Sequence, residues 1–284
     1  METKKIITAI CATALVLGGV YVADQWITGG FSIIHVSDPI SIKPEWMVPG
    51  PSQEERELLK RLLTQEFTYL DKGNQTYVFE SADGKYVIKL FNFDTLKNHP
   101  KKDWKMDRLF LGYRNAFLYD RDHTGLIVYH LPGFGGDLPK LTLRSGWGFS
   151  QTVDPNSLVF VVQQKARVTR TVFLELLKKH DLQALEARID ALIVLYLSEY
   201  RRGLIDQDRN LIHNTGFVGT IPLRLDVGKL QHDPQIIADG RWREDLQKIM
   251  YDRLKPWLQK QDPSQAEEIG ALVDKVYLKY KNSI

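Results

Sequence analysis

The chain is poor in cysteine and in patterned histidine. Cys11 is the single cysteine among 284 residues, which excludes an internal disulfide bond and a cysteine-rich metal site. The seven histidines are scattered along the chain and form no His-x-x-x-His pattern and no cluster with carboxylates. The sequence therefore predicts no zinc-type metal centre.

The chain also lacks an excess of charge of one sign. Its 38 Lys and Arg residues nearly balance its 35 Asp and Glu residues, and the two signs are interspersed. Proteins that bind nucleic acid usually carry a concentrated basic surface, so we predict no nucleic-acid partner. The length and the 43% hydrophobic content fit a globular protein with one large domain or two smaller lobes.

An uncharged apolar run lies near the N-terminus. Lys4 and Lys5 precede it, it covers residues 6–23, and Asp24 ends it. As a helix, this run would span about 27 Å, which is close to the thickness of a bilayer core. We expect residues 1–24 to be a transmembrane anchor or signal segment. We favour an uncleaved anchor because Tyr21 stands where a signal peptidase site needs a small residue.

The distribution of lysines gives this segment an orientation. Lysines precede the apolar run and none follows until Lys43. The positive-inside rule therefore places the N-terminus in the cytoplasm and the remaining chain outside, which predicts a membrane-anchored or exported protein. That orientation separates the domain from cytoplasmic ATP.

The remaining chain divides into a linker and one domain. Residues 25–52 are punctuated by Gly and Pro and predict a linker, with a short extended stretch at 31–36. Residues 53–284 are the expected domain, with an N-lobe over 53–164 and a C-lobe over 165–284. We expect helices at 54–64, around 106–118, at 169–202 with a break near 180–181, at 235–259 and at 263–280. We expect strands at 67–70, 76–79, 86–91, 138–153, 157–164, 211–218 and 222–226.

Two groups of polar residues differ from their largely apolar surroundings. Lys89 lies within an apolar strand, where a buried cation needs a carboxylate partner or an anionic ligand. The alternative is that Lys89 faces solvent beside Lys85. The second group lies in a polar loop and a later turn, and comprises Asp206, Asp208, Asn214 and Asp226. Taken alone, such residues are typical of polar turns in which side chains cap local backbone.

The order of these motifs resembles the protein-kinase-like superfamily over somewhat more than half of the chain. Val87-Ile88-Lys89 resembles the third-strand Val-Ala-Ile-Lys motif, and Leu204-Ile205-Asp206-Gln207-Asp208 followed by Asn214 resembles the catalytic loop. Asp226-Val227-Gly228 resembles the Asp-Phe-Gly motif. The resemblance implies an α+β, two-lobed protein-kinase-like fold with a small antiparallel β N-lobe and a reduced helical C-lobe.

The resemblance also implies ATP and Mg as cofactors and a role for each matching residue. Nucleotide contacts would come from the glycine-loop position, the third-strand lysine and the hinge, namely Gly73, Lys89 and Gln163. The catalytic carboxylate would be Asp208, with Asp206 as the alternative. The metal ligands would be Asn214 and Asp226.

Several departures from the family weaken the expectation of catalysis. Gly73 alone remains of the three loop glycines, and no glutamate occurs between Lys89 and Lys140, so Asp107 is the best-placed substitute. After Gly228 there is no Ala-Pro-Glu motif and little room for a peptide-substrate platform. We therefore expect a membrane-tethered, nucleotide-binding pseudokinase or interaction scaffold with a possible protein partner. The alternative is an active Mg-ATP-dependent phosphotransferase acting on a small molecule or a protein hydroxyl.

Overall fold

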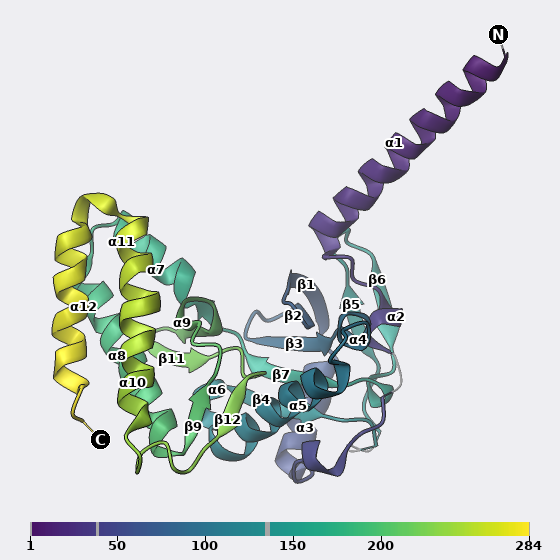
Figure 1. Cartoon of the computed structure of the whole chain (residues 1–284). Helices are drawn as coiled ribbons and strands as arrows, with labels where there is room; N and C mark the ends of the chain where they lie inside the picture. The colour runs from purple at the N-terminus through teal and green to yellow at the C-terminus, as the bar shows by residue number, and fades with distance from the viewer. Residues whose placement is uncertain (1, 38–39, 134–136, 284) are drawn as a thin grey trace. The chain divides into compact units, whose positions relative to one another are not determined.

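The structure is a computed structural model that describes residues 2–37, 40–133 and 137–283. Within the first helix it describes the side chains of residue 13 and of 16–28. The chain forms two compact units (Figure 1). The first unit comprises residues 1–42, 50–102 and 130–162, and the second comprises residues 43–49, 103–129 and 163–284.

The first unit is built on a mixed sheet. Its helices are α1 (Glu2–Thr28), α2 (Ile33–Val36), α3 (Gln53–Leu63) and α4 (Phe93–Lys97), and the short turn η2 (Pro155–Ser157) precedes its last strand. Its strands are β1 (Glu66–Lys72), β2 (Thr76–Ser81), β3 (Tyr86–Phe91), β5 (Leu141–Arg144), β6 (Ser150–Val153) and the first part of β7 (Phe160–Gln164). Their order is β7-β3-β2-β1-β5-β6.

The prediction of an antiparallel N-lobe sheet is wrong for one strand pair. The pairs β1–β2, β2–β3 and β5–β6 are antiparallel, but β1 and β5 run parallel. A parallel pair needs a long connection between its strands, and residues 73–140 provide one. The architecture is therefore mixed α/β, and a two-lobed kinase-like arrangement stays a proposal.

Of three predictions made from local sequence in this unit, two are confirmed. Ser52 and Glu55 form the predicted capping box of α3, with the Ser52 hydroxyl accepting from the Glu55 amide. Strand β3 covers the predicted residues 86–91. The extended stretch expected at 31–36 is wrong, because residues 33–36 form the helical turn α2 and bury Val36. The β-branched residues there pack a helical turn rather than a strand.

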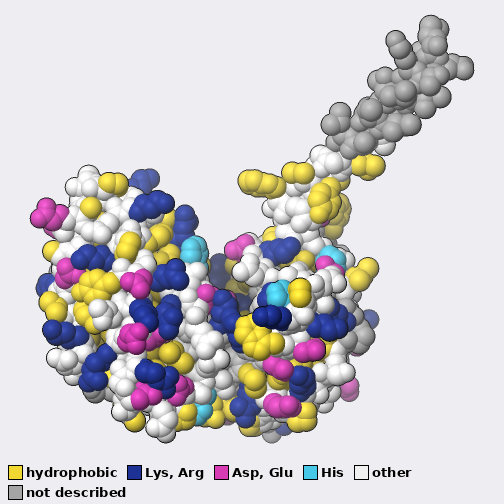
Figure 2. Space-filling view, in the orientation of Figure 1, with side chains coloured by type: hydrophobic (Ala, Val, Ile, Leu, Met, Phe, Trp, Pro, Cys, Tyr) yellow, Lys and Arg dark blue, Asp and Glu magenta, His cyan; other side chains and the backbone are white. Residues whose placement is uncertain are grey.

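The predicted membrane anchor is contradicted. No helix among the described residues is long and apolar enough to cross a membrane. The described side chains of α1 include an exposed apolar stretch (Figure 2), but Asp24 interrupts it and accepts a hydrogen bond from Trp147 Nε1 at 2.9 Å. About 20 consecutive apolar residues are needed to span a bilayer. The side chains of residues 1–12, 14 and 15 lie outside the described set.

The second unit is mainly helical and carries two small antiparallel sheets. Its helices are α5 (Lys102–Tyr119), α6 (Arg121–Thr124), α7 (Thr169–Lys178), α8 (Leu182–Arg201), α9 (Leu211–Asn214), α10 (Arg241–Lys248), α11 (Lys255–Gln261) and α12 (Ala266–Tyr280). Shorter turns are η1 (Pro44–Trp46), the π-helical η3 (Ile249–Leu254) and η4 (Pro263–Gln265). Its strands are β8 (Arg167–Val168), β9 (Leu204–Asp206), β10 (Thr215–Val218), β11 (Ile221–Arg224) and β12 (Leu230–His232), and β4 (Leu126–His130) ends at the unit boundary. The sheets are ordered β11-β10-β8 and β12-β9.

The core of the second unit lies around α8. Leu185, Ile189 and Leu192 are fully buried on its inner face, and Trp242 and Met250 belong to the same cluster. The predicted break near 180–181 is confirmed, because His180 has a φ of 52° and Asp181 caps α8 by accepting from the Ala184 amide. Basic and acidic side chains are interspersed over the face shown in Figure 2.

The strand expected at 211–218 is wrong in its first half. Residues 211–214 form the helical turn α9, and β10 begins at Thr215. The helical turn buries Leu211 and Ile212. Asn214, the last residue of α9, is held inside the unit as a result.

Candidate functional site

The polar residues predicted in the second half of the chain come together in the second unit. β9 ends at Asp206, and a short loop carries Asp208 into α9. The hairpin of β10 and β11 then returns the chain to Asp226, beside the end of α9. Residues separated by up to 20 positions in the sequence therefore occupy one place.

Asn214 joins the parts of this cluster. Its carbonyl oxygen accepts from the Leu225 amide at 2.7 Å and from the Asp226 amide at 3.2 Å. Its side-chain Nδ2 donates to Asp208 Oδ2 at 3.2 Å, and the residue is 6% exposed. Nδ2 can only donate, so the amide oxygen Oδ1 is the side-chain atom that can accept a hydrogen bond or bind a cation.

Asp206 lies beneath the cluster in a buried ionic network. Arg224 is fully buried and donates to Asp206 Oδ2 at 2.7 Å and to both carboxylate oxygens of Glu199 at 2.6 Å. The second oxygen of Asp206 accepts from the Asp208 amide at 2.9 Å. Burial raises the pKa of Asp206 and raises the pKa of Glu199 to about 7, although Arg224 opposes both shifts. The network fixes the end of β9 and the start of the loop.

Asp208 is half-buried and ionised. Its Oδ2 lies 2.9 Å from Lys229 Nζ and also accepts from Asn214. Burial alone would raise the pKa of Asp208, but the hydrogen bonds from Lys229 and Asn214 outweigh burial and lower it. Asp208 therefore presents a positioned carboxylate that holds no proton at neutral pH.

Asp226 is exposed at the start of a tight turn. Its Oδ1 accepts from the Gly228 amide at 3.0 Å, which closes the turn over Val227. Helix α5 packs directly on this turn at Gly112, where an added Cβ would lie 2.3 Å from the Val227 carbonyl oxygen. The α5 contact and the hydrogen bond to Gly228 hold the turn, and Asp226 remains exposed.

Two of the residues expected to contact the nucleotide, Gly73 and Lys89, belong to the first unit. Gly73 is exposed in the β1–β2 turn, where its amide donates to the Thr76 carbonyl oxygen at 2.8 Å. Lys89 is half-buried in β3, opposite Val78 of β2. Both belong to the first unit, so their convergence with Asp226 stays a prediction.

Gln163 is buried within the second unit. Its Nε2 donates to the carbonyl oxygens of Thr124 at 2.6 Å and of Arg224 at 3.1 Å. Its side chain therefore supports the backbone next to the ionic network. A hinge role for the backbone at this position stays a prediction.

The side-chain oxygens of Asn214 and Asp226 suit a cation that takes its remaining ligands from substrate phosphates and water. No group of three or more His, Cys, Asp or Glu side chains arranged to hold a metal occurs among the described residues. Magnesium, however, commonly uses one or two protein oxygens together with substrate phosphates and waters. Asn214 Oδ1 and the exposed Asp226 carboxylate fit that requirement, whereas Lys229 occupies the Asp208 oxygen that it contacts.

Sequence reasoning missed Arg224, Glu199 and Lys229. Arg224 was visible as a charged residue within the apolar strand 221–224, and Lys229 follows the Asp-Val-Gly turn directly. Neither signal identifies a partner, because Glu199 lies 25 positions before Arg224 and meets it through the packing of α8 on β11.

Comparisons with known proteins leave the family open. No protein-family model matches the chain, and no curated protein matches it. One solved structure, the complex of Rv3197 with erythromycin from Mycobacterium tuberculosis, aligns with 96% of this chain and 95% of its own. The identity is 12% and the TM-score is 0.33, which is too low to establish a shared fold.

Proposed function

We propose that the second unit binds the metal-complexed phosphates of a nucleotide such as Mg-ATP, and that the protein acts as a nucleotide-binding pseudokinase or interaction scaffold. Asn214 and Asp226 would hold the metal, and Asp208 with Lys229 would border the phosphate. When bound, the metal would neutralise phosphate charge. The proposal rests on one observation, the convergence of Asp208, Asn214 and Asp226 through Asn214.

The surroundings of these residues favour binding over phosphotransfer. Asp208 shares one oxygen with Lys229 and Asn214, and its lowered pKa makes it a weak proton acceptor. Asp107, the predicted substitute for the missing glutamate, is engaged by Lys43 at 2.7 Å and by Trp46 Nε1 at 3.1 Å. We assign Asp206 a positioning role, because its carboxylate is buried and paired with Arg224.

A thermal-shift titration tests nucleotide binding. Mg-ATP at about 100 times its dissociation constant should stabilise the parent by about 2.7 kcal/mol, a shift of several degrees. Asp226→Ala should abolish this shift, and the exposed Asp252→Ala should keep it as the matched control. Absence of a shift in the parent, or an equal shift in Asp226→Ala, would reject the proposed site.

A radiolabel-transfer assay decides between binding and catalysis. The pseudokinase assignment predicts no transfer of the labelled γ-phosphate to small hydroxyl compounds or to protein. Transfer by the parent that Asp208→Ala abolishes would establish the phosphotransferase alternative, because Asp208 holds the position of the family's proton acceptor. Lys89→Ala in both assays reports whether the first unit contributes to the same ligand.

A further inference from the structure

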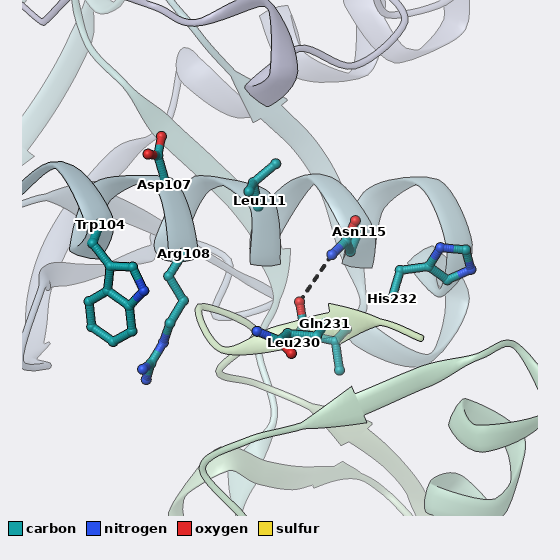
Figure 3. Close-up of a pocket in the computed structure, with 8 residues that line it drawn as sticks. All are labelled: Trp104, Asp107, Arg108, Leu111, Asn115, Leu230, Gln231 and His232. Carbon is teal, nitrogen blue, oxygen red and sulfur yellow. Dashed lines mark hydrogen bonds between the residues drawn. The ribbon is translucent and has the colours of Figure 1, made fainter. Parts of the chain in front are cut away.

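A cavity of about 360 Å³ lies in the second unit between α5 and β12. Trp104, Arg108 and Asn115 extend from α5 toward β12, where Leu230 and Gln231 form the opposite wall (Figure 3). The three α5 residues are four and seven positions apart, which places them along one helix face. Asn115 Nδ2 donates to the Leu230 carbonyl oxygen at 3.1 Å and ties the two walls together.

Arg108 gives this cavity a positive charge without a direct counter-ion. Its guanidinium lies 4.8 Å from the ring centre of Trp104. Among the described residues, no carboxylate forms an ion pair with Arg108, and the acidic lining residue Asp107 is paired with Lys43. A guanidinium held on an aromatic face keeps its planar N–H edge available for an anion.

Trp104 gives the same cavity an aromatic surface. This residue is 54% exposed, which is unusual for so large an apolar group in a structured helix. On the opposite side, His232 stacks on Tyr119 with ring centres 4.1 Å apart, so the β12 wall is held in place. The volume is at the lower end of small-molecule sites, which suits a ligand with one ring and excludes a folded peptide.

We propose that the α5–β12 cavity binds a small aromatic anion, with the anionic group on Arg108 and the ring against Trp104. Arginine recognises carboxylates and phosphates through paired hydrogen bonds, and the indole offers a stacking face. The site is separate from the nucleotide site proposed above. It is linked to that site in two ways: Lys229, the partner of Asp208, immediately precedes Leu230, and the charge of Arg108 helps to lower the pKa of Asp208.

Phenyl phosphate is the probe, measured by titration calorimetry on the full chain. It combines a ring with an anion, whereas phenol and inorganic phosphate each supply one half. We expect phenyl phosphate to bind at least about tenfold more tightly than either fragment. Benzoate replaces the phosphate by a carboxylate and reports which anion the site prefers. If inorganic phosphate binds as tightly as phenyl phosphate, the affinity comes from charge alone and the proposal is wrong.

Matched variants locate the probe. Arg108→Gln should weaken phenyl phosphate about tenfold or more, and Trp104→Ala about fivefold. Arg243→Gln is the control, because Arg243 lies 4.6 Å over the ring of Trp242 outside the cavity. Both cavity positions are at least partly exposed, so folding should survive, and circular dichroism checks it. Unchanged affinity in Arg108→Gln would refute the assignment.

The two proposed sites are distinguished by crossing their variants. Asp226→Ala should retain phenyl phosphate binding, and Arg108→Gln should retain the Mg-ATP thermal shift. If Mg-ATP fails to bind the parent while phenyl phosphate binds, the cavity stands and the nucleotide proposal falls. If Asp226→Ala loses both ligands, or Mg-ATP displaces phenyl phosphate competitively, the separate cavity site is wrong.

Discussion

Replacing Arg224 by methionine tests how the candidate site is supported. Arg224 is fully buried and is the direct ionic partner of Glu199 and Asp206. Methionine fills much of the side-chain volume but leaves two carboxyl groups without their cation. Removing one partner of a buried ion pair typically costs about 3–5 kcal/mol. We expect a loss in this range at pH 7.5, a large share of the stability of a typical domain.

The pH dependence of this loss has a defined sign. Burial raises the pKa of both carboxyl groups in the folded protein, so the folded state holds protons that the unfolded state releases. Stability therefore falls as pH rises from the ordinary carboxyl values to about 7. Without Arg224 the raised pKa values rise further. Between pH 5 and pH 7.5 the variant should lose up to about 3 kcal/mol for each carboxyl group, at about 1.36 kcal/mol per unit.

The assay is urea unfolding of parent and variant at pH 5 and pH 7.5, followed by circular dichroism. The stability difference should be larger at pH 7.5 and should shrink by about half or more at pH 5. Arg167→Met is the matched control, because its ion pair with Glu175 is exposed and should contribute less than about 1 kcal/mol. A difference for Arg224→Met that is small, or the same at both pH values, would refute the role given to burial.

Three further outcomes are expected. Gly112→Ala should destabilise the chain by about 2 kcal/mol in urea unfolding, because its Cβ would meet the Val227 carbonyl oxygen at 2.3 Å; full stability would mean that α5 does not pack on this turn. Ser52→Ala should cost about 1 kcal/mol through loss of the α3 capping box, and Ser52→Thr should restore most of it. Lys229→Met should raise the pKa of Asp208, as carboxyl-carbon NMR titration can measure, and an unchanged pKa would exclude the ion pair.

Local patterns in the sequence determined much of the secondary structure. The capping box at Ser52, the strand at 86–91 and the break before α8 depend on residues a few positions apart, so the chain itself specifies them. The resemblance to the kinase-like superfamily implied that Asp208, Asn214 and Asp226 belong to one site, and the structure brings these three residues together. The prediction that the N-terminal apolar run is a membrane anchor was wrong.

Only the tertiary structure decided what those residues contact. Three features join segments that lie far apart in the sequence. They are the parallel pairing of β1 with β5, the ion pair of Arg224 with Glu199, and the cavity between α5 and β12. A single sequence records which groups are charged or apolar, but it does not record which distant group satisfies a buried charge. The tertiary fold determines this partner, because an unpaired charge in the core costs several kcal/mol and packing must bring an opposite charge next to it.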